Sequence, residues 1–189
     1  MLPASSSDTP YLPGEAINKP APLRAPRPLW LAALIFLGVF ALLQWCWGEA
    51  RGTWVERLVI HEITVKPAAA LIRLISPEIS AAPAGASIKA AGGGLNILNG
   101  CEGTEVMFLL AAAFAALRLP WRRKLAGLTL GMILVFVLNQ GRILALFYAY
   151  RAGGGLFDAL HTLILPVLLI ALVALYVHAF LHCSRQGVA

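Results

Sequence analysis

Three side chains that lie far apart in the sequence have the types needed for nucleophilic catalysis: Cys101, Arg142 and His161. A thiol becomes a strong nucleophile as the thiolate, and an imidazole can accept its proton. A guanidinium stays protonated, so it can stabilise a thiolate or the oxyanion that forms when a peptide carbonyl is attacked. These residue types suit nucleophilic attack by a cysteine on a peptide carbonyl, for which no cofactor or metal is called for.

Two further polar residues are candidates for supporting roles. Asn139 lies three residues before Arg142, on the same face of a helix, and is a natural hydrogen-bonding companion. Glu105 lies one helical turn after Cys101, so it could pair with Arg142 or Arg151 and keep the site neutral. The thiol could be activated by the imidazole, by the guanidinium charge or by the N-terminal dipole of the helix that follows it.

The elements that would carry these residues are membrane helices. Hydrophobic residues make up 59% of the 189-residue chain and charged residues 13%, which a soluble domain of this size could not bury. The apolar blocks reach about 20 residues, enough to cross a hydrocarbon layer of ~30 Å. We predict an all-α integral membrane protein with about four transmembrane helices, at residues 29–47, 103–117, 125–150 and 156–181.

The basic residues indicate the orientation of these helices. They lie beside apolar blocks rather than in an aromatic-rich patch, which argues against nucleic-acid binding despite a net charge of +6. The densest cluster, residues 118–124, follows the second predicted helix, and such a loop stays in the cytoplasm. Arg24, Arg27 and Arg185 agree with two cytoplasmic termini.

Outside the predicted helices, the chain divides into a tail and one extracytoplasmic segment. Residues 1–28 contain seven prolines and no apolar periodicity, so we expect a disordered cytoplasmic tail before a membrane domain at 29–189. The extracytoplasmic segment covers residues 48–102. It should hold an amphipathic helix within 53–76 on the membrane surface, broken or ended by Pro67 and Pro77, and a small β-hairpin within 80–99.

This topology brings the candidate residues to one side of the membrane. Cys101 opens the second helix at its outer end. Arg142 lies eight residues before Tyr150 and His161 five residues after Leu156, which at ~1.5 Å per residue means depths of about 12 Å and 8 Å. Ionisable groups at such depths face a bundle interior or a wet cavity. Gly127 and Gly131, in G-x-x-x-G spacing, should allow close helix packing near the inner end.

The other cysteines and histidines permit rival interpretations. Cys46 also lies near the outer face, so a Cys46–Cys101 disulfide is possible in an oxidising compartment. His178, His182 and Cys183 could be interpreted as metal ligands, but we favour a plain inner interface, because the cluster lacks a further ligand.

Three short motifs carry a family resemblance: NGCEG at residues 99–103, NQGRI at 139–143 and FDALH at 157–161. Over roughly residues 99–181 the chain resembles the exosortase/archaeosortase family, most closely the short exosortase H type. The resemblance implies a transpeptidase-like cysteine enzyme at the outer face of a prokaryotic plasma membrane. It would recognise exported proteins by a C-terminal signal made of a short motif, a transmembrane stretch and a basic tail. Cys101 would be the nucleophile, with Arg142 and His161 as its partners.

The chain departs from that family in two respects. Larger members have about twice as many transmembrane helices, and many have a small hydroxyl residue after the cysteine, where this chain has Glu102. A carboxylate at that position opposes thiolate formation. Two alternatives remain open: a protease that transfers the acyl group to water rather than to an envelope amine, and a non-catalytic subunit of an export or transport assembly. In the second, Arg142, Glu105 and Asp158 would form a charged network.

Overall fold

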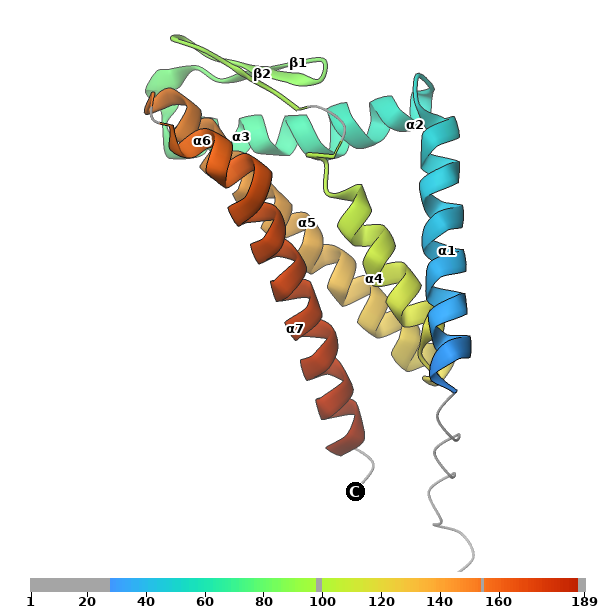
Figure 1. Cartoon of the computed structure of the whole chain (residues 1–189). Helices are drawn as coiled ribbons and strands as arrows, with labels where there is room; N and C mark the ends of the chain where they lie inside the picture. The colour runs from blue at the N-terminus through green and yellow to red at the C-terminus, as the bar shows by residue number, and fades with distance from the viewer. Residues whose placement is uncertain (1–27, 98–99, 154, 187–189) are drawn as a thin grey trace, which may run out of the picture.

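The computed structural model describes residues 28–97, 100–153 and 155–186, so almost all of the predicted tail at 1–28 lies outside the described residues. Its framework consists of three long apolar helical stretches within the described residues, whose arrangement Figure 1 shows. These are α1 (Leu29–Ala50), α5 (Trp121–Arg151), and a continuous helix formed by α6 (Leu156–Ala159), the π-helical η3 (Leu160–Ile164) and α7 (Leu165–Gln186). All three stretches are long and apolar enough to cross a membrane.

The fourth predicted membrane helix is present but short. It is α4 (Thr104–Ala116), whose 13 residues span about 20 Å, less than the ~30 Å of a hydrocarbon layer. It packs against α1 on one side and α5 on the other. The chain is therefore mostly helical and suited to a multi-pass membrane protein, with three helices of spanning length in its described part.

An apolar core joins α4, α5 and α7. Close packing was predicted from Gly127 and Gly131, and it is confirmed. A Cβ at Gly127 would lie 2.5 Å from a ring carbon of Phe114, and one at Gly131 would lie 2.6 Å from a methyl carbon of Leu110. Any larger residue would push α4 away from α5. The hydroxyl of Tyr176 on α7 donates to the Gly127 carbonyl at 2.6 Å, which ties the third helix to the same place.

One helical rod crosses the end of the bundle opposite to the start of α1 (Figure 1). It is formed by α2 (Trp54–Arg57), the π-helical η1 (Leu58–Val65) and α3 (Lys66–Ile75). A break at Pro67 was predicted, and this is wrong. The wider turns of η1 just before Pro67 let the helix continue past a residue that has no N–H. The rod ends at Ile75, two residues before Pro77, as predicted.

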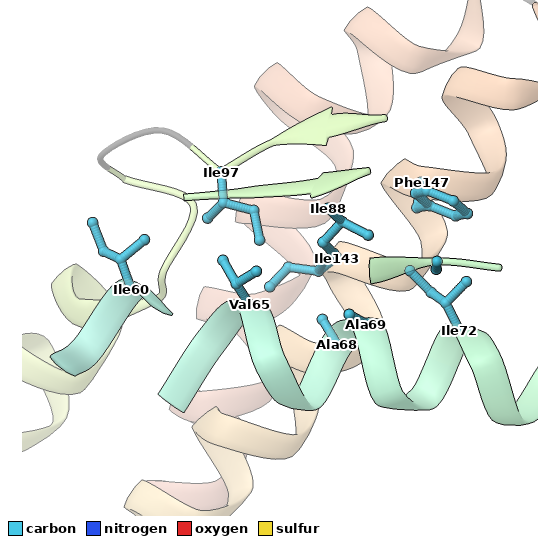
Figure 2. Close-up of a cluster of buried hydrophobic side chains, with 10 residues drawn as sticks. Ile60, Val65, Ala68, Ala69, Ile72, Ile88, Ile97, Ile143 and Phe147 are labelled. Carbon is cyan, nitrogen blue, oxygen red and sulfur yellow. The ribbon is translucent and has the colours of Figure 1, made fainter. Parts of the chain in front are cut away.

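A small sheet lies over this rod. Its antiparallel strands are β1 (Ala82–Ala84), β2 (Ser87–Lys89) and β3 (Leu95–Asn96), in that order, so the predicted hairpin gains a third strand. Ile88 and Ile97 point from the sheet region towards α3 (Figure 2). There they join a buried cluster with Val65 and Ile72 of the rod and Phe147 of α5. This second core anchors the sheet at the C-terminal end of α5, close to the motif that contains Cys101.

Candidate active site

Cys101 lies in a tight turn between the sheet and α4. Gly100 has a φ of +96° and Gly103 a φ of +82°, in the left-handed region that glycine adopts most easily. A Cβ at Gly103 would also come within 2.9 Å of the Asn139 side chain. The two glycines of the NGCEG motif therefore shape the turn and let it approach α5, whereas Asn99, the first residue of the motif, lies outside the described residues.

The thiol and the imidazole are in direct contact. Cys101 Sγ lies 3.1 Å from His161 Nε2, across 60 residues of sequence. The His161 ring stacks on Phe157, with centroids 5.6 Å apart and planes 7° from parallel, so its orientation is held from within the same helix. His161 belongs to the π-helical segment η3, and local π-helix is frequent at functional sites because it redirects side chains.

Asn139 and Arg142, both on α5, hold the backbone of the turn. Asn139 Nδ2 donates to the Cys101 carbonyl at 3.1 Å, and Arg142 Nη1 donates to the Gly100 carbonyl at 3.4 Å. The two side chains are 2% and 9% exposed. Among the described atoms, Arg142 Nε and Asn139 Oδ1 find no hydrogen-bond partner. The site thus contains polar atoms that a bound peptide could satisfy.

Glu102 contributes an interaction that the sequence did not reveal. The side chain is 3% exposed, and both of its oxygens accept hydrogen bonds. Oε2 accepts from the Gly100 amide at 2.6 Å, and Oε1 accepts from the Thr104 hydroxyl at 3.0 Å. The available signal was local: an acid between two glycines, with a hydroxyl residue two positions later, can form short-range hydrogen bonds to its own turn.

The surroundings of Cys101 favour the neutral thiol. Burial raises the pKa of Cys101, the nearby positive charge of Arg142 lowers it, and Glu102 raises it further, with burial as the largest cause. The net direction is upward. The thiol therefore needs a base to become a nucleophile, and His161 Nε2 is within reach of its proton.

The structure does not bring Glu105 into this cluster. Glu105 is exposed at the start of α4, and the one ion pair within the described parts of the chain joins Lys66 to Glu62. Arg151, its other expected partner, donates instead to the Ala91 carbonyl at 2.6 Å. Asp158 is exposed as well, so the charged network expected for a non-catalytic subunit does not form in this part of the molecule.

The rival roles of the other cysteines also lack geometric support. Cys46 and Cys101 are both free thiols, so the alternative disulfide is not formed. Within the described ranges, His178, His182 and Cys183 do not belong to any group of three or more side chains that could hold a metal ion.

Two apolar hollows lie below the turn, at the depth of the membrane helices. The larger, of about 340 Å³, lies between α1, α4 and α7 and begins at Val106, about one helical turn beyond the Cys101 motif. The smaller, of about 240 Å³, lies between α5 and α7 and includes Arg142 in its wall. Its remaining lining is almost entirely aliphatic, so a guanidinium borders an otherwise apolar space.

Comparison with known proteins identifies the family of this chain. Residues 23–177 match the model of the family described as transmembrane exosortase (Exosortase_EpsH), a range that includes the thiol, the imidazole, the guanidinium and all the helices that present them. Searches of curated proteins and of solved structures found no match. The matched range is well over half of the chain, and the chain therefore belongs to the transmembrane exosortase family.

Proposed function

We propose that this protein is a membrane cysteine transpeptidase or peptidase that cleaves C-terminal sorting signals from exported proteins. The single observation that carries the proposal is the 3.1 Å contact between Cys101 Sγ and His161 Nε2. A thiol and an imidazole at that distance can act as nucleophile and general base, and three helices converge to hold them. Membership of the exosortase family supports the same class of reaction.

The reaction would proceed in two steps. His161 Nε2 takes the thiol proton, and the sulfur attacks the scissile carbonyl carbon to give a tetrahedral oxyanion, stabilised by Arg142. The C–N bond then breaks, His161 returns the proton to the departing amine, and a thioester remains on Cys101. Water or an envelope amine next attacks the thioester, loses its proton to His161 and releases the processed protein, with the thiol regenerated.

The substrate would reach the thiol from within the membrane. Its own transmembrane stretch would pack along the apolar hollow between α1, α4 and α7, which at about 340 Å³ can take side chains of that helix; the lining includes the small residues Ala113 and Ala174. A helix in that place would present the peptide bond just before its start to the turn that carries Cys101. The short motif of the signal would bind above the hollow, near Arg142 and Asn139.

This arrangement implies an orientation in a prokaryotic plasma membrane. With α4 as a short fourth crossing, the basic residues 118–124 lie at the end of α4 remote from Cys101 and would face the cytoplasm. Both termini would then be cytoplasmic, with the sheet and the active site facing outward. The α2–α3 rod, which exposes Trp54 and Leu74, would rest on the outer membrane surface.

The test is a processing assay in cells. An exported protein whose C-terminus consists of a motif, an apolar stretch and a basic tail is expressed with the enzyme, and loss of the tail is followed by mass. Cys101→Ala should abolish processing, Cys46→Ser should leave it intact, and an acyl adduct on Cys101 should be recoverable. Normal processing by Cys101→Ala would overturn the proposal. Loss of processing in Cys46→Ser, with processing intact in Cys101→Ala, would move the nucleophile to Cys46.

A further inference from the structure

The residue directly after the proposed nucleophile is a buried acid in an unusual position. A carboxylate removed from water is costly unless hydrogen bonds or opposite charge compensate it. At Glu102 both oxygens are compensated, one by the Gly100 amide and the other by the Thr104 hydroxyl. The side chain therefore bridges the residue before Cys101 and the first residue of α4.

The turn is thus held from two independent sides. From α5, Arg142 and Asn139 bind the carbonyl groups of Gly100 and Cys101. From the α4 side, Glu102 binds the amide of Gly100. Because both backbone groups of Gly100 and the carbonyl of Cys101 are engaged, the direction of the Cys101 Cα–Cβ bond is fixed, and the sulfur reaches His161 by the choice of rotamer about that bond.

Glu102 also supplies a negative charge next to the sulfur. The charged or titratable side chains that act on the thiol are Arg142 from α5, His161 from η3 and Glu102 itself. In the η1 segment of the rod, the buried residues are Ile60, Thr64 and Val65, and none of them carries a charge. Glu102 is therefore the acid that counteracts Arg142 at this position, whereas Glu105 is exposed to the surroundings.

We propose that Glu102 is a positioning residue for Cys101: its carboxylate fastens the turn to α4, and its charge restrains thiolate formation in the resting enzyme. The inference rests on the proposed role of Cys101 as nucleophile. The charge of Glu102 raises the pKa of Cys101, which agrees with this role. The physical consequence is a thiol that is aimed at its base yet reacts slowly with other electrophiles.

The experiment measures the alkylation of Cys101 by iodoacetamide as a function of pH. The full-length protein is used with Cys46→Ser and Cys183→Ser, because the chain has three cysteines. Glu102→Gln keeps an oxygen for one hydrogen bond and loses the charge, so its profile should move to lower pH, with a rate near neutrality about three- to tenfold higher. Glu102→Asp keeps the charge, so its alkylation profile should stay at the more alkaline pH of the parent.

Glu105→Gln is the matched control, since it removes an exposed acid from the same helix start; its profile should coincide with that of the parent. A Glu102→Gln profile that coincides with the parent would overturn the inference, and so would an equal shift in Glu105→Gln. The positioning part predicts that Glu102→Gln processes the reporter better than Glu102→Ala; equal rates at equal amounts of folded protein would contradict it.

Failure of this inference can be distinguished from failure of the proposed function. Alkylation needs no substrate, whereas the role of Cys101 is decided by processing in Cys101→Ala. If Cys101→Ala is inactive and Glu102→Gln shows no shift, only the inference falls. If Cys101→Ala processes normally, the proposed function falls and takes the inference with it.

Discussion

The apolar core of the bundle and the polar turn above it are stabilised by different interactions. In the core, Gly127 and Gly131 admit the side chains of Phe114 and Leu110, and close packing sets the distance between α4 and α5. In the turn, Asn139, Arg142 and Glu102 hold the backbone through hydrogen bonds. Dispersion and close packing place helices but do not orient a single thiol, whereas hydrogen bonds are directional and can.

Removal of the proposed base, His161, should have the largest effect: it should affect the chemistry at the turn without affecting the core. His161→Ala leaves the core untouched and takes away the proposed proton acceptor, whose Nε2 lies 3.1 Å from Cys101 Sγ. Acyl-enzyme formation should fall by about 10²- to 10⁴-fold, with unchanged thermal stability. Rapid-quench mass spectrometry of the thioester gives the rate. A decrease of less than threefold would mean that another group deprotonates the thiol.

A larger residue in the core should produce the opposite result. Gly131→Val places atoms where a Cβ already comes within 2.6 Å of Leu110 and 2.8 Å of Tyr176. We expect a loss of about 1–3 kcal/mol in the free energy of unfolding. The alkylation profile of Cys101, measured on the folded fraction, should not move. A shifted profile would show that the core and the turn are not independent; Gly141→Ala, whose Cβ would meet no atoms, is the control for stability.

Loss of one hydrogen bond in the turn should have a moderate effect. Asn139→Ala removes the donor to the Cys101 carbonyl and leaves that half-buried acceptor without its partner. The cost of about 1–1.5 kcal/mol should appear as a roughly tenfold lower processing rate, since the thiol is less well aimed. Steady-state processing of the reporter, compared at equal enzyme amounts, checks this. An unaffected rate would assign the positioning of the turn to Arg142 and Glu102 alone.

The smallest effect concerns pH. Burial raises the pKa of Cys101 above that of a cysteine in an unfolded chain, so the native state favours the protonated thiol. The associated stability is present below the unfolded pKa and is lost as the pH rises through the native one. Cys101→Ser should therefore flatten the decline of thermal stability in the alkaline range. An unchanged decline would show that the thiol contributes nothing to it.

The local pattern of the sequence was sufficient to predict the long helices and to nominate the residues of the candidate site. Apolar blocks predicted the helices that became α1, α5 and α6–α7, because spanning a membrane depends on length and composition. The spacing of Gly127 and Gly131 indicated close packing for the same local reason. Cys101, Arg142 and His161 were identified because ionisable or nucleophilic groups within apolar helices are costly and rare.

Only the tertiary structure decided which of these groups meet. Depth along a helix follows from residue number, but the direction of a side chain depends on helix tilt, on the π-helical turns of η3 and on the left-handed glycines beside Cys101. That geometry brings His161 and Asn139 to the turn, exposes Glu105 and buries Glu102. Charge and hydropathy are local properties of a sequence, whereas a distance of 3.1 Å between residues 101 and 161 depends on the packing of the helices between them.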